Sequence, residues 1–133
     1  MNSTWIILGA TSSMARSFAR KVSGQGAAVL LAGRDMDDLK AMAEDCRLRG
    51  ARLAEAVRFD ASDPAGFPAL IDRMEAEEGE LNAAVFVGSM PAQAEIDTDP
   101  SLIDGVVQDS HTGPARFLQM LAPLQETRGG GTV

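Results

Sequence analysis

The spacing of apolar residues changes repeatedly along the 133-residue chain. Continuous apolar runs, which are typical of parallel strands covered on both faces, alternate with segments whose apolar residues recur every three or four positions. The runs predict strands at residues 4–8, 27–32, 53–59 and 83–87. The third run is mixed in polarity, which favours a position nearer the edge of the sheet for that strand.

Segments with helical spacing follow the strands. Apolar positions at intervals of three and four predict helices that begin near Ser13 and Leu39, and glycines follow both segments, as they commonly do past a helix end. Asp63 followed by Pro64 predicts the start of a third helix, with a side-chain cap and then proline at the first helical position.

The last third of the chain predicts a loop and a long interrupted helix. Residues 90–99 predict the loop. Helical spacing covers residues 102–125, and Pro114 within it predicts a break or a kink. Residues 129–131 are three glycines that form a linker, and residues 132–133 resemble the first step of a fifth strand.

This alternation of strands and helices predicts the fold class. Helical crossovers of ten or more residues between strands imply right-handed parallel connections, and hence an α/β fold with a doubly wound parallel sheet. No linker divides the chain, so residues 1–133 are expected to form one domain.

Composition narrows the class of partner. The net charge of −7 disfavours nucleic acid and anionic membranes. No apolar run approaches the roughly 20 residues that span a bilayer, and no basic segment precedes an apolar one at the N-terminus. Cys46 is the only cysteine, so no disulfide forms within the chain and a cytoplasmic location is expected. The single histidine, His111, has no cysteine neighbour, which argues against a zinc site.

The first strand leads directly into a glycine and a turn of small residues. Gly9 ends the apolar run, and a helix begins a few residues later. The N-terminus of such a helix carries unpaired N–H groups and a partial positive charge, which attract phosphate. Glycine can also be needed there simply to turn the chain, but the strand–turn–helix context favours nucleotide binding.

Residues 9–15 (GATSSMA) resemble the N-terminal cofactor motif of the short-chain dehydrogenases/reductases. That family has threonine-glycine, three residues and then glycine-x-glycine. Here Gly9 is the first glycine, Ser13 replaces the second and Ala15 the third, while Leu8 replaces the threonine. Alanine still permits close helix packing. Ser13 adds a side chain near the expected pyrophosphate position and would reshape that contact.

The resemblance continues after the third and fourth strands. Asp60 matches the family aspartate that contacts adenine, although a role as a turn residue explains it equally well. Gly88 is the one match to the family segment asparagine-asparagine-alanine-glycine, where the backbone passes the cofactor ribose. Ser110 stands where the family has a catalytic asparagine, which departs from its proton-relay arrangement. His111 is interpreted as a surface or packing residue.

Arg34 determines the expected cofactor. An acidic residue about 20 positions beyond the glycine motif would bind the ribose 2′-hydroxyl of NAD, but the chain has Gly33 and Arg34 there. An arginine at the start of a helix opposes the helix dipole, whereas a 2′-phosphate offers it a bidentate, charge-assisted partner. NADP(H) is therefore expected in preference to NAD(H). The positions expected to contact it are Gly9, Thr11, Ser12, Ser13, Met14, Arg34, Asp60, Ala61 and Gly88.

The family resemblance also implies what is missing. Family chemistry uses a serine, a tyrosine and a lysine four residues after the tyrosine, but this chain contains no tyrosine. Its lysines, Lys21 and Lys40, lie on the first two predicted helices. No residue of the chain is therefore expected to be catalytic.

The resemblance implies a Rossmann-like, three-layer α/β/α sheet with strand order 3-2-1-4, truncated at the start of the fifth strand. The expected function is the NAD(P)(H)-binding portion of an oxidoreductase that transfers hydride to or from a carbonyl or alcohol substrate, as a fragment or a truncated gene product. The alternative is a stand-alone, non-catalytic nucleotide-binding module with a regulatory or interaction role. Complete family members usually form dimers or tetramers, which makes a homo-oligomer an expected assembly.

Overall fold

Four parallel strands form the sheet in the computed structural model, which describes residues 2–88 and 90–133. The strands are β1 (Ser3–Leu8), β2 (Ala28–Gly33), β3 (Leu53–Arg58) and β4 (Glu80–Val85). Their order across the sheet is β3-β2-β1-β4, which confirms the Rossmann-like topology and places β3 at an edge. The predicted strand positions are confirmed, although β4 begins and ends earlier than its apolar run suggested, because it pairs with β1 from Ser3 opposite Glu80 to Leu8 opposite Val85.

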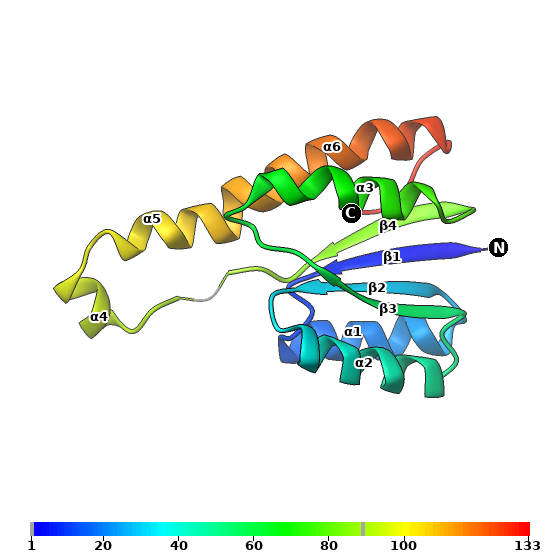
Figure 1. Cartoon of the computed structure of the whole chain (residues 1–133), viewed down its shortest axis with the longest axis horizontal. Coiled ribbons are helices and arrows are strands. Elements are labelled where there is room, and N and C mark those ends of the chain that lie inside the picture. Colours follow the sequence, from blue (N-terminus) through cyan, green and yellow to red (C-terminus); the bar gives the residue numbers. More distant parts are fainter. Residues whose placement is uncertain (1, 89) are drawn as a thin grey trace.

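Helices cover both faces of the sheet (Figure 1). The helices are α1 (Ser13–Gly24), α2 (Met36–Leu48), α3 (Phe67–Glu75), α4 (Gln93–Thr98), α5 (Leu102–Val107) and α6 (Gly113–Thr127). In Figure 1, α1 and α2 lie on one face and α3 and α6 on the other, giving the predicted three layers. The same view shows α4 and α5 extending beyond the carboxyl ends of the strands. Within the described residues, no helix is long and apolar enough to cross a membrane.

Each face of the sheet has its own apolar core. Ile6 and Leu8 of β1 pack into the cluster beneath α3 and α6, whereas Ile7 packs into the cluster beneath α1 and α2. All three side chains are fully buried, as expected for a parallel strand covered on both faces. In the first cluster, Phe59, the residue that follows β3, stacks on Phe67 with ring centroids 5.3 Å apart.

The predicted start of the third helix is wrong in detail. Asp63 makes no side-chain cap, and residues Pro64–Gly66 form a 3₁₀ turn before α3 begins at Phe67. Pro68, in the first turn of α3, has no backbone N–H and a fixed φ, so it fits a helix start better than a helix interior.

The segment predicted as a loop contains a short helix. The carboxylate of Glu95 accepts a hydrogen bond from the backbone N–H of Ala92 at 2.8 Å, and Ile96 is buried. These interactions stabilise the six residues of α4. The prediction of an uninterrupted loop over residues 90–99 was therefore wrong.

The helical chain does not break at Pro114 but widens just before it. Residues Gln108–Thr112 form a π-helical turn between α5 and α6, and Pro114 is buried in the first turn of α6. A helix start tolerates the missing N–H of proline. The predicted irregularity is present, but it takes the form of a wider turn, from which the Gln108 side chain donates to the Ala61 carbonyl at 2.9 Å.

Thr132 lies against the outer edge of β4. Its backbone N–H donates to the side-chain oxygen of Asn82 at 2.7 Å, and its carbonyl accepts from the Ala83 N–H at 2.9 Å. The last residues are not assigned to a strand, yet this pairing follows the direction predicted for them.

Candidate functional site

A cleft of about 240 Å³ lies at the carboxyl ends of the strands. Every strand contributes to its lining, either by its last residue or by the segment that follows it. Gly9, Thr11 and Ser12 follow β1, Gly33 ends β2 and Arg34 follows it, residues 59–61 follow β3, and residues 86–88 follow β4. Asp109, from the π-helical turn, completes the lining. The order of the strands reverses between β1 and β4, and ligands of such sheets bind in the crevice at that point.

Gly9 forms the base of the cleft in a conformation that side chains rarely adopt. Its φ is +72°, and a Cβ at this position would lie 2.0 Å from the carbonyl oxygen of Phe86. The N–H groups of Gly9 and Ala10 both donate to the Ala32 carbonyl, at 3.0 and 3.1 Å. The backbone therefore requires glycine for close packing, which also leaves space above the turn for a ligand.

The N-terminus of α1 presents donors beside Gly9. The Ser12 hydroxyl caps the helix by accepting from the Ala15 N–H at 3.1 Å. The backbone N–H groups of Thr11, Ser13 and Met14 have no acceptor among the described residues. Unpaired donors at the positive end of a 12-residue helix fit the charge and geometry of a phosphate group.

The structure brings together seven of the nine residues predicted to contact the cofactor: Gly9, Thr11, Ser12, Arg34, Asp60, Ala61 and Gly88. Ser13 and Met14 do not line the cleft, and the Met14 side chain is 71% exposed. Any contact from these two residues would come from their backbone N–H groups rather than from their side chains.

Asp60 has an observed role in its own turn. Its carboxylate accepts hydrogen bonds from the Ser62 N–H at 2.9 Å and from the Ser62 hydroxyl at 2.6 Å. These bonds, followed by the positive charges of Arg34 and Arg58, lower the pKa of Asp60 below its ordinary value. The turn interpretation is thus observed directly, while the adenine contact stays a prediction.

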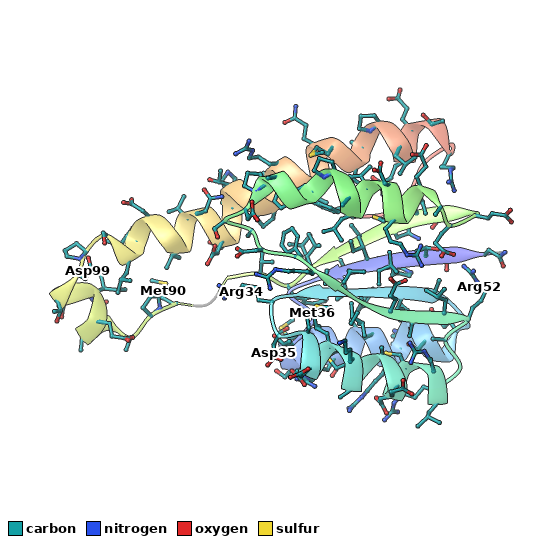
Figure 2. All side chains as sticks on the ribbon, in the orientation of Figure 1. Arg34, Asp35, Met36, Arg52, Met90 and Asp99 are labelled. Atoms are coloured by element: carbon teal, nitrogen blue, oxygen red, sulfur yellow. The ribbon has the colours of Figure 1, made fainter. Side chains whose placement is uncertain are left out.

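Arg34 carries an exposed positive charge at the mouth of the cleft. It follows β2 and immediately precedes Asp35, whose carboxylate caps α2 by accepting from the Asp38 N–H at 3.1 Å. No described carboxylate forms an ion pair with Arg34. Figure 2 shows Arg34 at the carboxyl end of the sheet and Arg52 at the opposite end.

Gly88 and Ser110 meet on the far side of the cleft. Gly88 has a φ of +103°, and a Cβ there would lie 2.8 Å from the Ser110 Cβ. From the π-helical turn, the Ser110 hydroxyl donates to the Val106 carbonyl of α5. The residue in the position of the family asparagine is therefore close to the cleft, with its hydroxyl hydrogen bonded to the backbone.

Several lining residues were not among the predicted contacts. Phe59, Phe86 and Val87 are the last residues of the predicted strands 53–59 and 83–87, so including the carboxyl-terminal residues of those strands in the expected site would have found them. Asp109 has no comparable signal, because the π-helical turn that points it toward the cleft leaves no periodic pattern in the sequence.

Comparison with known proteins agrees with this geometry. A family model described as enoyl-(acyl carrier protein) reductase matches residues 9–133. An uncharacterized oxidoreductase from Mycobacterium tuberculosis is 30% identical over 129 residues, which cover 96% of this chain and 51% of the relative.

Solved structures show the same fold. A short-chain type dehydrogenase/reductase from Mycobacterium marinum superposes with a TM-score of 0.85 at 24% identity, covering 98% of this chain and 53% of its own. A short-chain dehydrogenase from Sphingobium yanoikuyae in complex with NADPH gives a TM-score of 0.74 at 23% identity, covering 98% of this chain and 51% of its own.

These matches extend along nearly the whole chain, and the chain spans about half the length of the curated relatives it matches. The region matched by the family model begins at the glycine turn and includes β2, β3, β4 and the helices on both faces. The chain therefore belongs to the short-chain dehydrogenase/reductase family of oxidoreductases, with the NAD(P)-binding Rossmann fold of that family.

Proposed function

We propose that residues 1–133 form the NADP(H)-binding part of a short-chain oxidoreductase. In the complete protein this part would serve hydride transfer to or from a small carbonyl or alcohol substrate. The observation that supports the proposal best is a single cleft onto which the Gly9 turn, the donors of α1 and the Arg34 side chain all open. The NADPH complex of the Sphingobium yanoikuyae neighbour supports the same class of ligand.

The residues fit a dinucleotide by charge and shape. The N–H groups of Thr11 and Ser13 would donate to the pyrophosphate, with Gly9 leaving room for its close approach. Arg34 would bind the 2′-phosphate through charge-assisted hydrogen bonds. Asp60, held by Ser62, would face the adenine.

The chain supplies binding but no general acid. A bound nicotinamide supplies the hydride, and proton transfer to the substrate oxygen would need a residue such as the family tyrosine, which this chain does not contain. The Ser110 hydroxyl already donates its hydrogen bond to the Val106 carbonyl. We therefore propose that the chain is inactive alone, and measurable NADPH-dependent carbonyl reduction by the purified chain would contradict this.

Titration of purified chain with NADPH and NADH, followed by nicotinamide fluorescence, tests the cofactor assignment. Arg34→Ala is expected to weaken NADPH binding about tenfold and to change NADH binding much less, because a charge-assisted hydrogen bond to the 2′-phosphate is lost. Arg52→Ala removes the same charge at the opposite end of the sheet and serves as the control. An unchanged ratio of NADPH to NADH affinity in Arg34→Ala would refute the assignment.

A non-catalytic nucleotide-binding module is the second candidate. It is favoured by the replacement of the family asparagines by Val85 and Phe86 and by the engaged hydroxyl of Ser110. Reading the gene downstream of codon 133 discriminates the two candidates. A continuing reading frame that encodes tyrosine-x-x-x-lysine would exclude the stand-alone module.

For the complete enzyme we propose a cytoplasmic location and a homo-oligomeric assembly.

A further inference from the structure

The arginines of this acidic chain are mostly neutralised by carboxylates. Six of them form ion pairs: Arg16, Arg20, Arg47, Arg49, Arg52 and Arg73. The other four, Arg34, Arg58, Arg116 and Arg128, form none with the described residues, and Arg34 and Arg58 are both exposed. Arg34 and Arg58 differ from the other two in position, because they lie at the ends of neighbouring strands that border the cleft.

The register of β2 and β3 brings these two arginines together. Arg58, the last residue of β3, lies opposite Gly33, the last residue of β2, and the next N–H, of Phe59, donates to the Gly33 carbonyl at 2.9 Å. The Arg58 guanidinium then reaches across and donates to the Arg34 carbonyl, with an Nη1–O distance of 3.5 Å. Arg58 therefore contacts the backbone of the residue assigned to the 2′-phosphate.

Asp60 reports the charge that both arginines create. Both guanidinium groups lower the pKa of its carboxyl, after the larger effect of its hydrogen bonds with Ser62. Among the described residues, Asp60 forms no ion pair with Arg34 or with Arg58. At the edge of the cleft between β2 and β3, the two positive charges are offset only in part by Asp60, and no described carboxylate forms an ion pair with either arginine.

We propose that Arg58 is a positioning residue for the 2′-phosphate site, which holds the Arg34 turn in place and adds a second positive charge beside it. This inference rests on the proposed binding of NADP(H). A phosphate monoester carries a charge of about −1.5 to −2 at neutral pH, so a second nearby cation would complete its neutralisation. Mutual repulsion of the two arginines in the ligand-free chain would be relieved by the same anion.

Isothermal titration calorimetry, which measures the affinity of the full chain for two cofactor fragments, tests the role of Arg58. Adenosine 2′,5′-bisphosphate carries the 2′-phosphate, and 5′-AMP lacks it. Arg58→Gln is expected to weaken the binding of the bisphosphate about fivefold to tenfold, which is the order of one partly solvated charge-assisted interaction. The affinity for 5′-AMP is expected to change less than about twofold. Arg58→Lys, which keeps the charge, is expected to recover most of the loss. Arg52→Gln is the control for charge at the other end of the sheet.

Each outcome decides one of the two claims. If Arg58→Gln weakens both fragments equally, Arg58 only maintains the backbone and the inference is wrong. If Arg34→Gln selectively weakens binding of the bisphosphate but Arg58→Gln does not, the inference fails while the proposed NADP(H) site stands. If the unmodified chain binds neither the bisphosphate nor NADPH, both fail. Thermal unfolding of each variant identifies any variant that has lost its fold, and Arg58→Lys then carries the comparison.

Discussion

Gly9 illustrates how a single residue sets the shape of the site. Its positive φ and its contact with the Phe86 carbonyl fix the path of the chain from β1 into α1. Gly26 has a similar φ of +79°, but a Cβ there would meet nothing within 4 Å. Comparing the two glycines therefore separates two free-energy costs of adding a side chain: the cost of a positive φ, which both positions share, and the cost of a clash with the Phe86 carbonyl, which only Gly9 has.

Substituting these two glycines tests that separation. Gly26→Ala is expected to destabilise the chain by about 1 kcal/mol, the cost of a left-handed conformation for alanine. Gly9→Ala is expected to lower the free energy of unfolding by about 3 kcal/mol, because its methyl group must also displace backbone. Urea unfolding measures both values, and equal destabilisation by the two substitutions would contradict the close contact.

Asp60 predicts a pH dependence of stability. Its folded-state pKa is lowered, chiefly by the hydrogen bonds from Ser62, whereas an aspartate in the unfolded chain has a pKa of about 3.9. The stabilisation is thus complete above that value and is lost as the pH falls through the lowered pKa. Between pH 5 and pH 3, Asp60→Asn should lose less unfolding free energy than the unmodified chain, and identical losses would show that the Ser62 bonds do not matter.

At the scale of elements, Arg16 connects the glycine turn to two helices. From α1 its Nε donates to the Thr11 carbonyl at 3.1 Å, and its guanidinium pairs with Asp38 of α2. Both side chains are about one-third exposed, so the pair contributes less than about 1 kcal/mol to stability. Its consequence is geometric, because it fixes the turn that presents the donors to the cleft.

Removal of this connection should affect both cofactors alike. Arg16→Ala is expected to weaken the binding of NADH and of NADPH by a similar factor, about threefold. The reason is that the turn beside the pyrophosphate loses less than about 1 kcal/mol of stabilisation. Fluorescence titration of both cofactors measures the two affinities. A selective loss of NADPH binding would instead make Arg16 part of the 2′-phosphate site.

Elements with strong apolar patterns could be predicted from the sequence, and short or irregular ones could not. The runs that became β1 and β2, and the helical faces of α1 and α2, were recognisable because burial on both sides of the sheet demands them. The helix α4 has one buried apolar residue, Ile96, which is too little for a periodic signal. The π-helical turn contacts the segments that follow β3 and β4, through Gln108 with the Ala61 carbonyl and Ser110 beside Gly88, and residue spacing does not reveal these contacts.

The same distinction applies to the candidate site. Gly9, Arg34 and Gly88 occupy strand ends that a pattern can locate, so their convergence was foreseeable. The contact between Arg58 and the Arg34 carbonyl depends on the register of β2 against β3, which no local pattern specifies. Asp109 joins the cleft from a segment far along the chain, through the π-helical turn.

For the whole molecule, the cleft joins segments that follow all four strands, so a ligand there binds the assembled sheet rather than any one segment. A ligand that binds only the folded state at 100 times its dissociation constant stabilises that state by about 2.7 kcal/mol. NADPH is therefore expected to raise the midpoint of thermal unfolding by roughly 10 °C in a chain of this size. At equal concentration NADH should raise it less, and an equal or absent rise with NADPH would contradict the proposed preference.

Nuclear magnetic resonance of the ¹⁵N-labelled chain during titration with NADPH tests the central claim most directly, because it locates the nucleotide on the molecule. The predicted result is saturable movement of the backbone amide signals of Thr11, Ser13 and Gly88, at the carboxyl ends of the strands. The amides of residues 129–131, at the other end of the sheet, should stay in place. Saturable shifts confined to residues 129–131, or no saturable shift anywhere, would contradict the account.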